Sequence, residues 1–181
     1  TLLKYRGPDD FNIASSEHVL LGHCRLSIID LNGGKQPFKY TYNDIEYTIV
    51  YNGEIYNMNT IKEQLIDEGY HFTSQSDTGP RCLNLFDGIF SFVISYQNKL
   101  FVARDQLGVK PLYYYQKDDL FIFSSEIKCI LMYLGRCVVD ETGLKELLGL
   151  GPSVSPGKTI YKDIYSLRPA HYMNVFNGYK E

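Results

Sequence analysis

The chain has 181 residues, a length that suits one domain of ordinary size with its own hydrophobic core. The net charge is −3 and the sequence has no Lys/Arg cluster, so it gives no sign of nucleic-acid binding. No apolar run approaches the roughly 20 residues of a membrane span. Four cysteines without metal-ligand spacing, and no recognisable secretory signal, favour reduced thiols in a cytoplasmic protein.

Extended segments are expected to dominate the first half of the chain. Residues 18–26 and 45–51 have strand composition, and the second segment alternates in a way that gives it one apolar face. That face consists of Ile45, Tyr47, Ile49 and Tyr51. A helix is predicted over residues 58–68, with Asn57 as its N-cap and Gly69 as its stop.

The second half continues the strand pattern. Residues 89–94 are apolar on both faces, which indicates a strand buried between two layers. Further strands are expected at residues 100–103, 112–115, 120–123, 159–161 and 172–176. Helices are predicted over residues 126–134 and 141–150, the latter capped by Asp140, and residues 152–157 form a surface loop. The pattern favours an α+β fold, a sandwich of two antiparallel sheets with helices outside, without internal repeat or linker.

The dipeptide Asn52-Gly53 follows directly on the strand-like run of residues 45–50. Its side-chain carboxamide and its backbone amide place two N–H donors side by side, as the oxyanion of a tetrahedral intermediate requires. Asn-Gly is also the strongest short hairpin signal. Taken alone, the dipeptide favours a turn, and only its context favours an oxyanion hole.

Five segments in order along the chain supply that context. They are residues 6–10 (RGPDD), residues 23–37 (HCRLSIIDLNGGKQP), residues 52–54 (NGE), residues 76–78 (SDT) and residues 104–114 (RDQLGVKPLYY). As an ordered set they resemble the amino-terminal glutaminase domain of glutamine-hydrolysing asparagine synthetase, a class II glutamine amidotransferase. The resemblance continues through residues 124–128 and 147–153 to the carboxyl end, and so covers nearly all of residues 1–181.

The resemblance implies the four-layer αββα fold of amino-terminal-nucleophile hydrolases, in agreement with the sandwich pattern. It implies hydrolysis of glutamine to glutamate, with ammonia passed to a separate synthetase domain of the same polypeptide. That domain amidates aspartate with ATP and Mg²⁺. No Gly-rich phosphate loop occurs here, so this domain itself is expected to need no cofactor or metal. Glutamine and the synthetase domain are the expected partners, and a homodimer is a further possibility.

The resemblance also implies roles for individual residues. Asn52 and Gly53 correspond to the oxyanion donors. Arg25 corresponds to the residue that fixes the α-carboxylate of glutamine, a task for which a guanidinium fork is well suited. The anions that receive the α-amino group correspond to Asp77 and Glu54. Main-chain contacts near the ligand are expected from Leu26 and Ile28.

One departure from the family concerns the nucleophile, which in the family is a cysteine at the start of the mature chain. The sequence begins at Thr1, only five residues before the segment at residues 6–10. We therefore expect the nucleophile segment to be missing, and residues 1–181 alone to be inactive. Thr1 matches a mid-helix position of the family and is not a substitute. Cys24 neighbours Arg25 in a strand and should face away from it. Buried or half-buried apolar positions are expected for Cys82, Cys129 and Cys137.

A second departure lies at Thr78-Gly79, where the family has a helix that this sequence lacks. We expect these two residues not to be bonded, in which case their Cα atoms would be well beyond the roughly 3.8 Å of a trans peptide.

Structural roles are expected for several neighbours of these segments. His23 is expected to be a hydrogen-bonded strand residue rather than a base. Arg104 and Asp105 are expected to organise the loop at residues 108–111. The Gly33-Gly34 turn and Gln36-Pro37 are likewise structural.

Taken singly, each binding residue has an ordinary interpretation: Arg25 as an ion-paired arginine, Asp77 as a cap or turn residue and Glu54 as a solvated carboxylate. Their joint occurrence in family order favours glutamine binding. The alternatives are a class II amidotransferase with another acceptor and a non-catalytic module of the same fold. An amino-terminal-nucleophile peptidase is disfavoured, because Arg25 and Asp77 suit a free amino acid.

Overall fold

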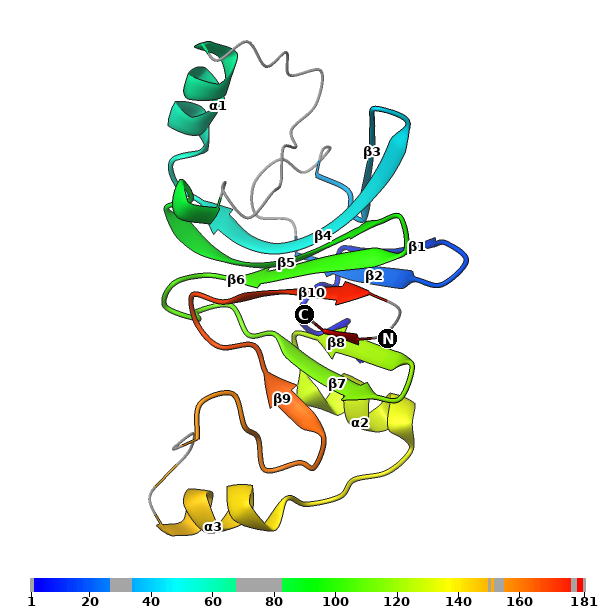
Figure 1. Ribbon diagram of the computed structural model, residues 1–181, viewed down its shortest axis with the longest axis vertical. Coiled ribbons are helices and arrows are strands. Elements are labelled where there is room, and N and C mark those ends of the chain that lie inside the picture. The colour runs from blue at the N-terminus through cyan, green and yellow to red at the C-terminus, as the bar shows by residue number, and fades with distance from the viewer. Residues whose placement is uncertain are drawn as a thin grey trace.

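The computed structural model describes residues 2–26, 34–67, 83–149, 151, 155–176 and 179–180. Its strands are β1 (Asp10–Ser15), β2 (Leu20–Arg25), β3 (Phe38–Tyr42), β4 (Ile45–Ile55), β5 (Gly88–Tyr96), β6 (Lys99–Arg104), β7 (Tyr113–Lys117), β8 (Leu120–Ser124), β9 (Ile164–Ser166), β10 (Tyr172–Phe176) and β11 (Tyr179–Lys180). Its helices are α1 (Met58–Asp67), α2 (Ile127–Leu134) and α3 (Glu141–Gly149). Figure 1 shows these elements stacked in layers.

Antiparallel pairing joins the strands into three sheets. The largest has the order β11-β10-β6-β5-β4-β3, a smaller one has the order β8-β7-β9, and β1 pairs with β2. Figure 1 places α1 on one side of the large sheet, and β7, β8 and α2 on the other side. The arrangement is a four-layer αββα sandwich, as the sequence predicts.

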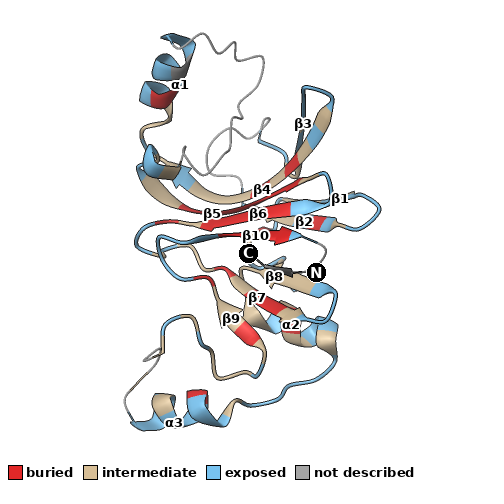
Figure 2. Cartoon of the chain, viewed as in Figure 1, coloured by how far each residue is buried: buried red, intermediate tan, exposed pale blue. Residues whose placement is uncertain are grey.

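Three apolar clusters correspond to the spaces between the four layers. The cluster between the sheets contains Leu21, Val50, Val93, Leu100, Val102, Leu112, Tyr114, Leu167, Met173 and Val175. The outer face of the large sheet carries Phe90, Phe92, Ile94, Phe101 and Ala103, and the space under α2 is filled by Tyr115, Ile130 and Ile164. Figure 2 shows the buried residues concentrated in the strands of the large sheet. The predicted doubly buried strand is confirmed, because β5 contributes to two of these clusters.

Several predicted elements are confirmed, with shifted ends. Each predicted helix forms, and the Asp140 carboxylate caps α3 by accepting a hydrogen bond from the amide of Gly143 at 2.7 Å. The predicted strand over residues 159–161 is wrong: Tyr161 makes an isolated bridge to Val139, and the strand forms at β9 instead. β1, β3, β9 and β11 were not predicted, and the last two have only three and two residues.

Two further expectations concern Asn57 and the cysteines. Asn57 holds the N-cap position, as predicted, because it directly precedes α1 and its carbonyl accepts from the amide of Ile61 at 3.0 Å. The side chain of Asn57 donates to the carbonyl of Leu85 at 2.7 Å and accepts from the amide of Asp87 at 2.9 Å, and so fixes the approach to β5. Cys137 is exposed rather than buried, whereas Cys129 is half-buried as expected. The positions of Cys82, Gly69 and the Thr78-Gly79 junction lie outside the described residues.

Within the described residues, no helix has the length and apolar character needed to cross a bilayer.

Candidate functional site

Asn52 and Gly53 lie within the long strand β4, where they pair with Ser91 and Phe90 of β5. Because β4 continues to Ile55, the hairpin-turn alternative for this dipeptide is excluded. Gly53 has a φ of 151°, and a Cβ atom there would collide with the carbonyl oxygen of Ile89. The position therefore requires glycine, and β4 carries a local irregularity at the predicted pair of donors.

Strand pairing determines where the N–H group of Gly53 points. The amide of Phe90 donates to the Asp105 carboxylate at 3.3 Å, and the carbonyl of Phe90 accepts from the Asp105 amide at 2.8 Å. Since Phe90 uses both groups on the β6 side, Gly53 and Phe90 form a non-hydrogen-bonded pair. The N–H of Gly53 is therefore directed to the other edge of β4, the edge that faces β3.

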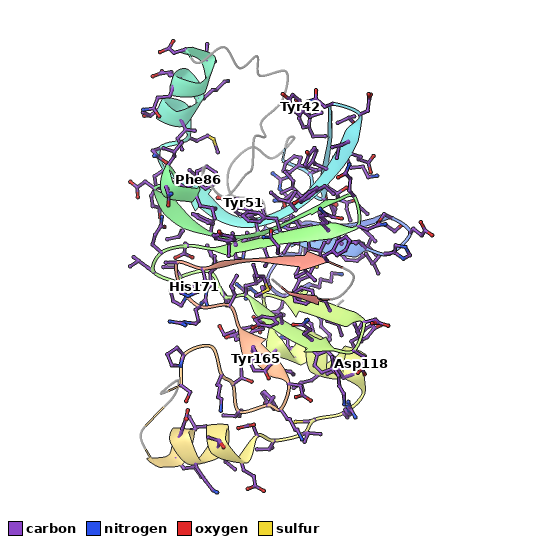
Figure 3. The ribbon with its side chains drawn as sticks, in the orientation of Figure 1. Tyr42, Tyr51, Phe86, Asp118, Tyr165 and His171 are labelled. Carbon is purple, nitrogen blue, oxygen red and sulfur yellow. The ribbon has the colours of Figure 1, made fainter. Side chains whose placement is uncertain are left out.

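Alternation along the strands places the predicted residues on the inter-sheet side. Tyr51 packs against the outer cluster, whereas Val50 belongs to the inter-sheet core, so Asn52 shares the side of Val50. In β2, Leu21 is buried in the same core, and Arg25 shares its side. Figure 3 shows the Tyr51 side chain on β4, on the side of the large sheet that carries α1.

The opposite face of β2 has a different character. Leu20 is 68% exposed there, and alternation places Cys24 on the same side as Leu20. This orientation agrees with the expectation that Cys24 turns away from the side that Arg25 occupies.

His23 connects β2 to β4. Burial of the half-buried ring lowers the pKa of His23, while a hydrogen bond to the main chain of Tyr51 acts in the opposite direction. The charge of Arg25 also lowers this pKa, and the charge of Asp10 raises it. His23 therefore contacts the residue before Asn52 and lies within electrostatic reach of Arg25. It has the structural role that the sequence predicts.

Gln36 contacts β4 beside the predicted donors. Its Nε2 donates to the carbonyl of Tyr51 at 3.0 Å, and its Oε1 accepts from the amide of Tyr51 at 2.6 Å. Two residues earlier, a Cβ atom on Gly34 would lie 3.1 Å from Nη2 of Arg25. Residues 34–36 therefore contact both the guanidinium of Arg25 and the main chain beside Asn52.

Of the four remaining predicted site residues, two are exposed and two lie outside the described residues. Glu54 is exposed two residues after Asn52, and its charge acts with burial to raise the pKa of the Tyr51 phenol. Leu26 is 54% exposed at the end of β2. Ile28 and Asp77 lie outside the described residues. The structure thus brings Arg25, Asn52 and Gly53 to one region, with Glu54 exposed beside them in β4 and Leu26 exposed at the end of β2.

Arg104 and Asp105 organise the loop at residues 108–111, as the sequence predicts. The fully buried Asp105 carboxylate accepts from the amides of Leu107, Val109, Lys110 and Phe90 at 3.0–3.3 Å. The Arg104 guanidinium donates to the carbonyls of Gly108, Lys110 and Leu167. These contacts support β5 from behind, on the side away from Gly53.

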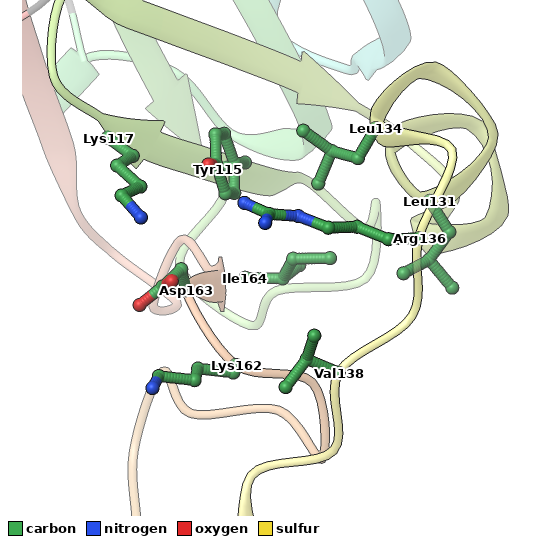
Figure 4. A pocket seen from close by; sticks show the side chains of 9 residues that line it. All are labelled: Tyr115, Lys117, Leu131, Leu134, Arg136, Val138, Lys162, Asp163 and Ile164. Carbon is green, nitrogen blue, oxygen red and sulfur yellow. The ribbon is translucent and has the colours of Figure 1, made fainter.

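A cavity of about 140 Å³ lies elsewhere, between the small sheet and α2 (Figure 4). None of the predicted site residues that the structure describes lines it, so it is not the site described above. Its lining consists of Tyr115, Lys117, Leu131, Leu134, Arg136, Val138, Lys162, Asp163 and Ile164.

Comparison with solved structures identifies the class of fold. Glutamine phosphoribosylpyrophosphate amidotransferase from Bacillus subtilis superposes with a TM-score of 0.61 over 90% of this chain and 34% of that chain, at 19% identity. The allosteric regulatory enzyme of purine biosynthesis superposes with a TM-score of 0.60 at 18% identity, over 90% of this chain and 34% of the other. The chain thus shares the fold of these two enzymes.

Sequence comparison identifies the family. The model of the glutamine amidotransferase domain matches residues 1–181, and the chain belongs to that family. Asparagine synthetase [glutamine-hydrolyzing] 3 of Bacillus subtilis strain 168 is 44% identical, over 93% of this chain and 30% of the relative. Asparagine synthetase B [glutamine-hydrolyzing] of Escherichia coli K12 is 34% identical, over 72% and 25% respectively. Amidase chry2 of Gibberella zeae is 34% identical, over 95% and 27%. The chain spans less than a third of each of these relatives.

Proposed function

We propose that this domain hydrolyses glutamine to glutamate and delivers ammonia to a separate ATP- and Mg²⁺-dependent synthetase domain of a longer cytoplasmic protein, which amidates aspartate. The observation that carries the proposal is the Asn52-Gly53 pair in β4, with the Gly53 N–H directed to the edge that faces β3. Two fixed donors at one point suit an oxyanion. Membership of the glutamine amidotransferase family supports this assignment.

Glutamine is a zwitterion, so its binding needs a fixed cation and a fixed anion. We assign the cation to Arg25, whose fork can hold the α-carboxylate through two parallel hydrogen bonds. The α-amino group is assigned to Asp77 and Glu54, with main-chain contacts from Leu26 and Ile28. This grip leaves the side-chain amide of glutamine free to reach Asn52 and Gly53.

The proposed nucleophile is an amino-terminal cysteine of the mature protein, outside the 181 residues, with its own α-amino group as base. The sulfur attacks the amide carbon of glutamine, and the resulting oxyanion is held by the Asn52 carboxamide and the Gly53 amide. The C–N bond then breaks, ammonia leaves with the transferred proton, and a thioester remains. Water adds to the thioester through a second oxyanion, releases glutamate and restores the thiol. None of these steps uses a cofactor.

Ammonia release from glutamine by the full-length protein tests this proposal. Asn52→Ala is expected to lower kcat by roughly 100–1000-fold, the usual cost of one lost oxyanion donor. Arg25→Ala is expected to raise KM strongly, because it removes ground-state binding. Matched controls are Asn59→Ala and Arg168→Ala at exposed positions, which should leave both constants unchanged. A folded full-length protein that releases no ammonia would favour the non-catalytic module.

A second candidate differs in the ammonia acceptor, since one relative is named an amidase rather than a synthetase. Supplying aspartate, ATP and Mg²⁺ with glutamine distinguishes the two: asparagine formation supports aspartate as the acceptor. Glutamine hydrolysis without asparagine formation would indicate another acceptor and leave the glutaminase assignment intact.

A further inference from the structure

The main-chain ladder between β3 and β4 stops before it reaches the predicted donors. Phe38 pairs with Ile49 at the end of β3. If the ladder continued in the same register, residue 36 would pair with Tyr51, and residue 34 with Gly53. The chain does not continue in this way: Gly34 lies beside the guanidinium of Arg25 instead.

The side chain of Gln36 replaces the missing main-chain partner of Tyr51. A carboxamide carries the same donor and acceptor as a peptide group, so it can satisfy both main-chain groups of one strand residue. The two hydrogen bonds between Gln36 and Tyr51, at 2.6 and 3.0 Å, do so. The Gln36 side chain thus satisfies both main-chain groups of Tyr51 at the β4 edge, and no further strand is needed at this position.

The end of the ladder matters for Gly53. A main-chain neighbour at residue 34 would take the Gly53 N–H, which points to this edge, and would remove it as an oxyanion donor. The Tyr51 carbonyl also belongs to the peptide plane that leads to Asn52, so fixing this carbonyl restricts the orientation of Asn52. Both predicted donors therefore depend on the arrangement at Tyr51.

We propose that Gln36 is a positioning residue of the oxyanion hole: its side chain closes the β4 edge at Tyr51, orients the Tyr51-Asn52 peptide and keeps the Gly53 N–H accessible to the substrate. This inference rests on the proposed glutaminase function. His23, which also hydrogen-bonds to the main chain of Tyr51, provides a second support for the same peptide.

Glutaminase kinetics of the full-length protein with Gln36→Glu test the inference. The variant keeps the shape of the side chain and an acceptor for the Tyr51 amide, but it removes the donor and sets a carboxylate oxygen against the Tyr51 carbonyl. We expect kcat to fall roughly tenfold or more, short of the loss from removing a donor outright. KM for glutamine should change little. Gln106→Glu is the matched control, because Gln106 also donates its amide to a main-chain carbonyl, that of Phe86, at 3.1 Å on the surface.

A double-mutant cycle separates positioning from a merely structural role. If Gln36 acts through Asn52, Gln36→Glu should have a much smaller effect on kcat in the Asn52→Ala background than in the wild type. Equal effects in both backgrounds would overturn the orientation of Asn52 by Gln36, and an unchanged kcat in the wild-type background would overturn the positioning role as a whole. The glutaminase assignment stands in either case. Absence of glutaminase activity in the wild-type protein would instead overturn the assignment, and the positioning role with it.

Amide hydrogen exchange in the unsubstituted protein gives an independent readout if the variant fails to fold. The Tyr51 amide, bonded to Gln36, should be protected, and the Gly53 amide should exchange much faster than its neighbours within β4. A Gly53 amide as protected as that of Tyr51 would contradict the inference.

Discussion

Phe90 lies directly opposite Gly53 across the β4–β5 ladder, and its Cα atom is 2.6 Å from the position that a Cβ atom on Gly53 would occupy. The main-chain groups of Phe90 are bonded to Asp105 on the far side of β5. The strand opposite the candidate oxyanion donor is thus held in place and cannot easily retreat. This relationship makes Gly53 a sensitive position for both stability and activity.

Gly53→Ala should destabilise the domain by about 1–3 kcal/mol, because the backbone conformation disfavours a side chain and the added methyl group meets β5. The midpoint and slope of urea unfolding measure this change. Gly22→Ala in β2 is the matched control, since a Cβ atom there has no neighbour within 4 Å. Its effect should stay within about 0.5 kcal/mol. Equal stability of the two variants would contradict the close approach at Gly53.

Asp105→Asn should be among the most destabilising conservative substitutions, with a loss of about 3 kcal/mol. The buried carboxylate accepts four main-chain amides, and an NH₂ group in its place would leave donors facing donors. Thermal unfolding measures the loss. The same change at the exposed Asp118, which has a φ of 51° that asparagine tolerates well, should be nearly neutral. A small effect at Asp105 would mean that the amides find other acceptors.

The strands that sequence predicts best are those with strong apolar patterns. Residues 89–94 are apolar on both faces, and their burial between layers follows from that pattern alone. β9 escapes prediction because its position in the sheet depends on a partner far along the chain, with Tyr113 opposite Ser166. Local propensity carries no information about such partners.

The candidate site divides in a similar way. The Asn-Gly dipeptide draws attention to β4, but sequence alone favours a turn, and only the pairing with β5 removes that alternative. The contact of Gln36 with Tyr51 could have been found only from the register of β3, a strand that was not predicted. Side-chain substitutes for strand pairing leave no periodic signal, so they become visible only once the neighbouring ladder is known.

Glu126→Gln should lower stability at neutral pH by about 1 kcal/mol. A hydrogen bond from the Tyr5 hydroxyl and the guanidinium of Arg6, at 2.7 Å, lower the pKa of Glu126. The corresponding stability is therefore present above the unfolded-state value near 4.5 and is lost as pH falls through the folded-state pKa. The gap in Tm between variant and wild type should narrow below about pH 4.5.

Glu46→Gln is the matched control for Glu126→Gln. Glu46 pairs with Lys39 at 2.9 Å, but the two side chains are 56% and 50% exposed. Solvent screens this pair, so its loss should cost no more than about 0.5 kcal/mol. A Glu126 variant as mild as the Glu46 variant at pH 7 would mean that the contact with Arg6 and Tyr5 adds no stability.

Acidification should destabilise the domain through His23. Burial holds the pKa of His23 below the unfolded value of about 6.5, so the unfolded chain binds more protons as pH falls below that value. Stability is then lost from about pH 6.5 downward, and the loss levels off once pH passes the folded-state pKa. His23→Gln removes this titration, so its free energy of unfolding should depend less steeply on pH between about 7 and 5 than that of the wild type. Chemical denaturation at each pH measures the two slopes. Equal slopes would mean that the hydrogen bond to Tyr51 and the attraction of Asp10 offset the cost of burying the charged ring. A wild type that gains stability on acidification would mean that they outweigh this cost.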